Sequence, residues 1–155
     1  MKKNKHMALT YLGLGTNLGN KQQNLNDAIA ALSVEVGGVM AVSSFRISAP
    51  WGFDSENTFL NAVVLMETEL TPLALLKKTQ EIERSLGRTA KSTSGYADRL
   101  IDIDILLYDN LFVDQPALKI PHPLIMERDF VIIPLVEIAP DLVHPVTGQR
   151  LADIL

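Results

Sequence analysis

The sequence predicts an α+β fold, in which helices pack on an antiparallel sheet, and three observations lead to this prediction. Isoleucine or leucine occupies every second position from 101 to 107, as in a half-buried strand. Two other segments place apolar residues at the spacing of an amphipathic helix. The predicted elements follow one another as strand, helix, strand, strand, helix, strand, which is the βαββαβ order of a ferredoxin-like fold.

The first half of the chain supplies one helix and three of the four strands. Residues 8–15 are predicted to form a strand that ends in glycines, and Asn17 or Asn20 can cap the helix that follows. Further strands are expected at 39–48 and 59–69, joined by a loop that is rich in turn-forming residues. The apolar stripe of the helix consists of Leu25, Ala28, Ile29 and Leu32.

The second half adds a helix, the last strand and a partly helical end. Thr71 is the predicted N-cap of the second helix, and Pro72 is its first residue. A polar loop at 88–99 then leads into the last strand. We expect the segment 126–138 to be partly helical and interrupted by Pro134. The core stripe of the second helix consists of Leu75, Thr79, Ile82 and Leu86.

Length and composition indicate one soluble globular domain. With 155 residues, 47% of them hydrophobic, the chain is long enough for a core, and we expect one domain over 8–155 after a disordered lead-in at 1–7. No apolar run approaches the ~18 residues of a membrane span, so we expect no membrane partner. The absence of cysteine excludes disulfides and thiolate metal sites and is compatible with a cytoplasmic location.

The charge distribution favours a local anion site over a nucleic-acid surface. The net charge is −4, whereas general nucleic-acid binders are usually basic. Between 84 and 99, however, the chain has four cationic residues and a single acid. We therefore expect no nucleic-acid partner and a small anionic ligand near this segment. The cationic residues are Arg84, Arg88, Lys91 and Arg99.

Two aspartates one residue apart, Asp102 and Asp104, are the strongest candidates for chemistry. Side chains two positions apart on a strand share a face and lie roughly 6.5–7 Å apart. Carboxylates that close repel each other unless a positive charge lies between them, and their hard oxygen atoms suit Mg²⁺. A solvated strand face is the alternative interpretation. The basic residues upstream favour Mg²⁺ and a polyphosphate.

Other candidate residues have both a functional and a structural interpretation. Gln80 and Glu83 share a helix face, which is either a solvated flank or an extension of the carboxylate cluster. Phe59 and Phe130 are either core residues or a sandwich for a flat heterocycle. Asn61, on the same strand face as Phe59, could hydrogen-bond with the edge of such a ring as donor and acceptor together.

Other binding motifs are excluded or weak. No Gly-x-x-x-x-Gly-Lys-Ser/Thr sequence is present, which excludes a P-loop, and the glycines at 13, 15 and 19 have one residue too many for a dinucleotide fingerprint. His122 has no second histidine at metal-ligand spacing, which disfavours zinc. It is either a phosphate contact or a plain surface residue, and Arg128 could join the same anion site.

Seven motifs, taken in their order and spacing, resemble one enzyme family. They are Tyr-Leu-Gly-Leu-Gly-Thr-Asn-Leu-Gly at 11–19, Phe-Leu-Asn-Ala at 59–62, Thr-Gln-x-Ile-Glu at 79–83, Gly-Arg at 87–88, Arg-x-Ile-Asp-Ile-Asp-Ile-Leu-Leu-Tyr at 99–108, Ile-Pro-His-Pro at 120–123 and Glu-Arg-x-Phe-Val at 127–131. Through them the chain resembles the 6-hydroxymethyl-7,8-dihydropterin pyrophosphokinases of folate biosynthesis over nearly its whole length.

The resemblance implies a reaction and a set of roles. ATP would be the co-substrate, the pterin hydroxymethyl group would attack its β-phosphorus, and AMP would leave. Two Mg²⁺ ions would be held by Asp102 and Asp104, which with Arg88 and Arg99 form the implied catalytic set, in an enzyme expected to be a monomer. The implied pterin contacts are Ser48, Pro50, Trp51, Phe59, Asn61, Tyr96 and Phe130. The implied ATP contacts are Gln80, Glu83, Arg88, Lys91, Arg99, Ile105, Lys119, His122 and Arg128.

The chain departs from the family pattern in the segment that the resemblance implies to be a lid over the site. Many members carry a tryptophan in this lid, whereas the stretch from Lys91 to Arg99 has none. Tyr96 is the candidate replacement for that tryptophan.

Two other classes of protein share this fold, so the fold alone does not decide the function. An RNA-binding module would need exposed aromatics on its central strands and a basic face, and here the last strand carries aspartates instead. A non-catalytic regulatory domain would not need an aspartate pair beside a cationic loop.

Overall fold

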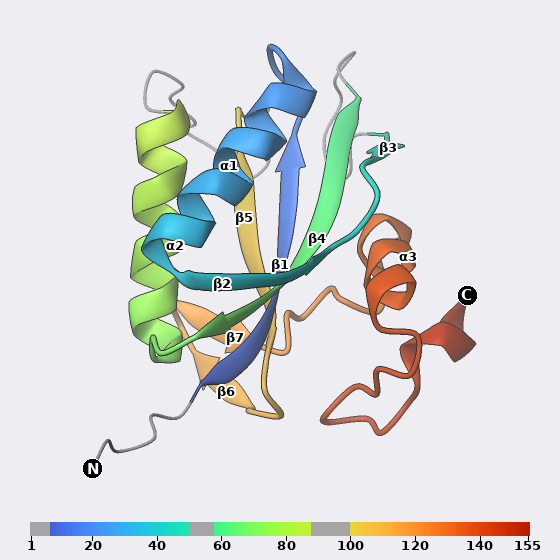
Figure 1. Cartoon of the computed structure of the whole chain (residues 1–155). Helices are drawn as coiled ribbons and strands as arrows, with labels where there is room; N and C mark the ends of the chain where they lie inside the picture. The colour runs from blue at the N-terminus through green and yellow to red at the C-terminus, as the bar shows by residue number, and fades with distance from the viewer. Residues whose placement is uncertain (1–6, 50–57, 88–99) are drawn as a thin grey trace.

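The computed structural model describes residues 7–49, 58–87 and 100–155, and its central element is an antiparallel sheet (Figure 1). The strand order is β2-β4-β1-β5, and β3 also pairs with β4. This order and the chain sequence of the elements confirm the predicted ferredoxin-like fold. The strands are β1 (Ala8–Thr16), β2 (Gly37–Val42), β3 (Arg46–Ser48), β4 (Phe59–Thr68) and β5 (Asp102–Tyr108).

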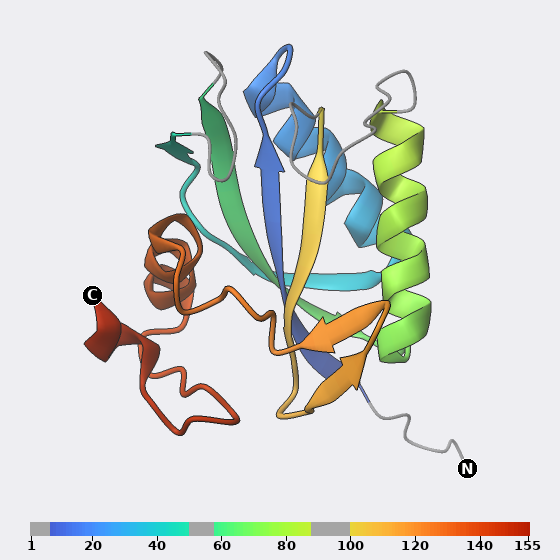
Figure 2. The same ribbon diagram turned by 180° about the vertical axis from the view of Figure 1, so that it is seen from behind.

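Helices lie on both faces of the sheet, and they differ in what they cover (Figures 1 and 2). Helices α1 (Lys21–Glu35) and α2 (Pro72–Gly87) pack on one face, where they bury the larger apolar cluster. Helix α3 (Asp129–Ile138) and a short 3₁₀ turn, η1 (Leu151–Ile154), pack on the other face around a smaller cluster. A separate hairpin of β6 (Val113–Gln115) and β7 (Leu118–Ile120) follows β5.

The two predicted helices are confirmed, with their caps and buried stripes. The side chain of Asn20 accepts a hydrogen bond from the Gln23 backbone at 3.1 Å, so Asn20 is the N-cap of α1. At the start of α2, the Thr71 hydroxyl accepts a hydrogen bond from the Ala74 backbone N–H at 3.3 Å. The residues buried in these two helices are Leu25, Ala28, Leu32, Leu75, Thr79 and Ile82. Among the described residues, no helix is long and apolar enough to cross a membrane.

The strand predicted at 39–48 is wrong as a single element, because the chain forms β2 and β3 with a break between them. From Val42 to Arg46 the chain takes four steps, while β4 takes three steps from Val64 to Asn61, so one residue is extra. The Ser43 hydroxyl accepts the Val63 N–H at 2.9 Å, a bond that a backbone carbonyl would make in a regular ladder.

The predicted interruption by Pro134 is also wrong. Helix α3 is continuous from Asp129 to Ile138, with Pro134 buried inside it. Inside a helix, proline removes the hydrogen bond that its own nitrogen would donate and crowds the carbonyl four residues earlier, while its fixed φ suits a helix. Packing of α3 on the sheet offsets that loss, since Val131 and Leu135 on either side of Pro134 are buried against it.

Candidate active site

The register of the sheet brings the two predicted halves of the site to either side of β1. Gly15 lies opposite Asn61 on β4 and opposite Asp102 on β5, and Gly13 lies opposite Asp104. Directly opposed residues of antiparallel strands project from the same face, so the amide and both carboxylates share one face. Because the β1 residues between them are glycines, no side chain separates the two groups.

The carboxylate pair lies next to a buried cation. Arg128, which directly precedes α3, places Nη1 3.9 Å from Asp104 Oδ2, and its side chain is only 8% exposed. Its guanidinium also lies over the Phe130 ring, 5.5 Å from the centroid. A largely desolvated arginine beside Asp104, with Asp102 on the same strand face, forms a strongly charged patch, which suits a ligand that carries negative charge together with a cation.

The donor set at this patch fits Mg²⁺. In the parts of the chain that the structure describes, no group of three or more His, Cys, Asp or Glu side chains could hold a metal ion. Mg²⁺ does not require such a cage, because it keeps several waters and binds through one or two carboxylates together with substrate phosphates. The carboxylates of Asp102 and Asp104, on one face of β5, are donors of this kind.

The outer edge of β5 is bordered by α2. Glu83 Oε2 accepts a hydrogen bond from the Ile103 backbone N–H at 2.7 Å. Gln80, one turn earlier on the same helix, is exposed. Ile105 buries its side chain in the core, but its backbone groups face the same edge as those of Ile103, because alternate residues of a strand point the same way. Helix α2 therefore packs beside the aspartate-bearing strand, the condition under which Glu83 could join the carboxylate cluster.

His122 is an uncharged hydrogen-bond donor at neutral pH. Its backbone N–H donates to the Leu106 carbonyl at 2.9 Å, and its Nδ1 accepts the Leu124 N–H at 3.1 Å. Burial, and secondarily the charge of Arg128, lowers the pKa of His122 to about 4. Because Nδ1 is an acceptor, the ring proton resides on Nε2, which can donate to a ligand oxygen.

Asn61 and Phe59 form a packed pair on the other side of β1. Asn61 is 5% exposed, and its Nδ2 donates to Ser48 Oγ at 2.6 Å. A methyl group on Gly15 would lie 3.1 Å from Asn61 Oδ1 and 3.6 Å from Phe59 Cδ1, so both side chains lean over this glycine. With respect to the described residues, the amide retains Oδ1 and one N–H for a ligand.

The remaining predicted residues fall into two groups. Phe130, in the first turn of α3, is half-buried in the smaller cluster, and Lys119 on β7 is exposed and pairs with Asp114. Six predicted residues lie outside the described part of the chain: Pro50, Trp51, Arg88, Lys91, Tyr96 and Arg99.

The role of Gly15 was missed in the sequence, where the glycines of this segment were tested only as a dinucleotide fingerprint. The signal that could have identified it is a residue without a side chain inside a predicted central strand, since such a glycine marks a close approach of another group.

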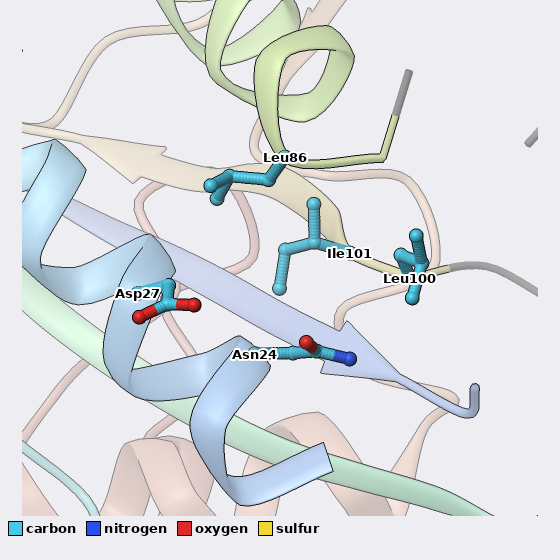
Figure 3. A pocket seen from close by; sticks show the side chains of 5 residues that line it. All are labelled: Asn24, Asp27, Leu86, Leu100 and Ile101. Atoms are coloured by element: carbon cyan, nitrogen blue, oxygen red, sulfur yellow. The ribbon is translucent and has the colours of Figure 1, made fainter. Parts of the chain in front are cut away.

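A small pocket lies elsewhere, between α1 and the start of β5 (Figure 3). Asn24 and Asp27 line it from α1, and Leu86, Leu100 and Ile101 line it from the other side. Ile101 belongs to the apolar cluster under α1 and α2, so this pocket is on the face opposite the aspartate carboxylates. None of the predicted site residues lines it.

Comparison with known proteins identifies the family. The family model of 7,8-dihydro-6-hydroxymethylpterin-pyrophosphokinase (HPPK) matches residues 11–140. A 2-amino-4-hydroxy-6-hydroxymethyldihydropteridine pyrophosphokinase of Porphyromonas gingivalis is 50% identical over 141 residues, covering 90% of this chain and 95% of that protein. The enzyme of the same name from Aquifex aeolicus is 40% identical over 147 residues, covering 95% and 90%.

A solved structure supports the fold. The HPPK-DHPS protein of Plasmodium falciparum, crystallised with pteroate, superposes with a TM-score of 0.78 at 13% identity. The match covers 98% of this chain but 44% of that protein, so this chain spans less than half of its length. At this identity the likeness concerns the fold alone. The family match and the two bacterial relatives show that the chain belongs to the 7,8-dihydro-6-hydroxymethylpterin-pyrophosphokinase family.

Proposed function

We propose that this chain transfers pyrophosphate from ATP to the hydroxymethyl group of 6-hydroxymethyl-7,8-dihydropterin and releases AMP, a step of folate biosynthesis. The family match and the named relatives support this reaction. The structural observation that carries the proposal is the position of Gly15 between Asn61 and Asp102. A ring-recognising amide and a metal-binding carboxylate lie on one face, with a strip of bare backbone between them.

On the phosphate side, the proposal assigns two Mg²⁺ ions to Asp102 and Asp104. Bound Mg²⁺ would neutralise charge on the triphosphate and orient it. Arg128 and the Nε2–H of His122 supply further positive charge and a neutral donor. The outer edge of β5, where Ile105 offers backbone groups beside α2, suits the adenine. The other proposed ATP contacts are Gln80, Glu83, Arg88, Lys91, Arg99 and Lys119.

On the pterin side, Phe59 and Phe130 are proposed to hold the two faces of the ring and Asn61 its polar edge. The buried amide of Asn61 supports this role, since its orientation is fixed by Ser48 and it retains both a donor and an acceptor. A ring that hydrogen-bonds through both would leave no buried polar group unsatisfied. The other proposed contacts are Ser48, Pro50, Trp51 and Tyr96.

The proposed reaction depends mainly on how the protein positions the two substrates. The hydroxymethyl oxygen forms a bond to the β-phosphorus and loses its proton to solvent, the bond from that phosphorus to the bridging α,β-oxygen breaks, and AMP leaves with that oxygen. Reactions of this type depend on in-line placement and charge neutralisation more than on a strong protein base. Arg88 and Arg99 are proposed to meet the charge that develops on the phosphate oxygens.

We also propose an oligomeric state, domain bounds and a cellular location for the enzyme. We propose that the enzyme acts as a monomer, since the described residues of the proposed site, carried mainly by β1, β3, β4, β5, α2 and the start of α3, form both of its sides. We assign the activity to a single domain over 8–155, preceded by a lead-in at 1–7, and we place it in the cytoplasm, where ATP and Mg²⁺ are supplied.

The test is incubation of the purified protein with ATP, Mg²⁺ and 6-hydroxymethyl-7,8-dihydropterin. AMP that appears only when the pterin is present is the expected result. ADP would overturn the proposed position of attack, and the absence of nucleotide turnover would favour the regulatory-domain alternative. Asp102→Ala is the matched loss-of-function variant, and Asp141→Ala, at an exposed ion pair with Arg150, is its control.

A further inference from the structure

Glu137, in the last turn of α3, ties this helix to a segment that is distant in the sequence. Its Oε2 accepts two hydrogen bonds from Ser44, one from the backbone N–H at 2.8 Å and one from the hydroxyl at 2.6 Å. Its Oε1 lies 3.7 Å from Arg46 Nε. The bonds from the Ser44 hydroxyl and then from its backbone are the main causes that lower the pKa of Glu137, so both favour the charged carboxylate.

The segment held by Glu137 leads into the shortest strand of the main sheet. β3 has three residues, pairs with no strand but β4 within the described part of the chain, and exposes Ile47 to 74%. A three-residue edge strand with little burial has few contacts of its own to fix its position. In Figure 1, α3 lies directly beside β3, and the two elements are in contact. The Glu137 carboxylate therefore holds this segment with hydrogen bonds that the pairing of β3 with β4 does not provide.

The last residue of β3 acts on the proposed pterin site. Ser48 Oγ accepts the Asn61 Nδ2 hydrogen at 2.6 Å, which fixes the rotation of the amide. At its other end, α3 begins at Asp129 and carries Phe130 in its first turn. Glu137 thus links the element that carries Phe130 to the element that orients Asn61.

Building on the proposed function, we propose that Glu137 is a positioning residue for the pterin side of the site. By holding Ser44 and Arg46, it keeps β3 in place, so that Ser48 holds the Asn61 amide in the orientation that the pterin edge requires. Asp102, Asp104 and Glu83 belong to the opposite side of β1. The tie should therefore affect pterin binding and leave ATP binding unchanged.

The experiment compares Glu137→Ala and Glu137→Gln with the wild type. The wild-type assay comes first, because lack of pterin-dependent AMP formation would refute the proposed function whatever Glu137 does. Given an active wild type, Glu137→Ala should raise the pterin KM about tenfold, the equivalent of one charge-assisted hydrogen bond, or about 1.4 kcal/mol. The KM for ATP should stay within about twofold, because the lost bonds are local to β3.

A conservative variant and a control separate positioning from general stability. Glu137→Gln keeps an oxygen that can accept from Ser44, so it should restore the pterin KM to within about threefold of wild type. Ser44→Ala, which removes only the hydroxyl bond, should give an intermediate pterin KM. Glu35→Ala breaks another carboxylate bond between elements, to Lys78 at 3.2 Å on the opposite face, and should change neither KM.

Two results would overturn the proposal. One is a pterin KM within twofold of wild type in Glu137→Ala, or in Ser44→Ala should Glu137→Ala fail to fold. The other is an equal rise of the two KM values, which would show general loosening instead of positioning.

Discussion

Adding one methyl group to β1 should disable the pterin site while leaving the fold intact. In Gly15→Ala, the new Cβ would lie 3.1 Å from Asn61 Oδ1, 3.6 Å from Phe59 Cδ1 and 3.9 Å from Phe59 Cε1. The contact to the oxygen is short, and the Asn61 amide cannot rotate away freely because Ser48 holds it at 2.6 Å. The amide must therefore move by a few tenths of an ångström, on the edge that the pterin would occupy.

The expected magnitude follows from these contacts. Loss of a hydrogen bond between Asn61 and the ring would cost about 0.5–1.5 kcal/mol, and crowding by the methyl group would add to it. We therefore expect kcat/KM for the pterin to fall by about 10- to 100-fold, or about 1.4–2.7 kcal/mol. Gly15 does not have a positive φ, so alanine meets no backbone strain. Stability should change by less than about 1 kcal/mol.

The assay is pterin-dependent AMP formation at saturating ATP, with thermal unfolding measured in parallel. Gly13→Ala is the matched control, since it adds the same methyl group on the same strand and face. There the nearest atoms are the Leu106 methyl carbons at 3.4 Å, an apolar contact at ordinary van der Waals distance. Wild-type kcat/KM in Gly15→Ala, or an equal loss in both variants, would refute the reasoning.

Three further predictions address the phosphate side and its pH dependence. Asp102→Ala or Asp104→Ala should abolish turnover but leave pterin binding, followed by fluorescence titration, within about threefold, because the metals act on phosphate; a near wild-type kcat would contradict the metal assignment. Glu83→Ala leaves the Ile103 N–H without its acceptor and should raise the ATP KM about three- to tenfold with an unchanged pterin KM; the reverse pattern would remove Glu83 from the nucleotide edge. Because the folded pKa of His122 is lowered to about 4, the unfolded chain binds its proton first as the pH falls from about 6.5, so stability should decline between about pH 6.5 and 4 by at most about 3 kcal/mol. Urea unfolding of wild type and His122→Gln would test this, and equal pH dependence of the two would exclude His122 as the cause.

Local patterns in the sequence were sufficient for the parts of the site that lie on one element. Asp102 and Asp104 share a face because side-chain direction on a strand has a period of two, which needs no knowledge of the partner strand. Asn20 caps α1 for a similarly local reason. The approach of Glu83 to β5 could be framed only as a condition, because it depends on how α2 packs.

The features that were not predicted from the sequence depend on contacts between residues that are far apart in the chain. The break between β2 and β3 depends on Ser43 bonding to Val63 and on Ser44 bonding to Glu137, contacts that join residues 20 and 93 positions apart. Pro134 is accepted inside α3 because the helix packs on the sheet, and no local rule contains that packing. Propensity is overruled where tertiary contacts are strong enough to offset it.

The register of β1 is the feature on which the two halves of the site depend together. Neighbouring strands lie about 4.8 Å apart, so β4 and β5, on either side of β1, hold the Asn61 amide and the aspartate carboxylates about 10 Å apart. A slip of one residue would turn Asp102 and Asp104 to the apolar face, and the same slip in β4 would turn Asn61 away. The structure has one irregularity in the pairing of β1 with β5, between Tyr11 and Leu12, and it lies outside the stretch where Gly13 and Gly15 face the aspartates. Regular pairing is thus kept where Gly13 and Gly15 face the aspartates, and the bulge beyond this stretch leaves the Leu106 carbonyl to accept the His122 backbone N–H.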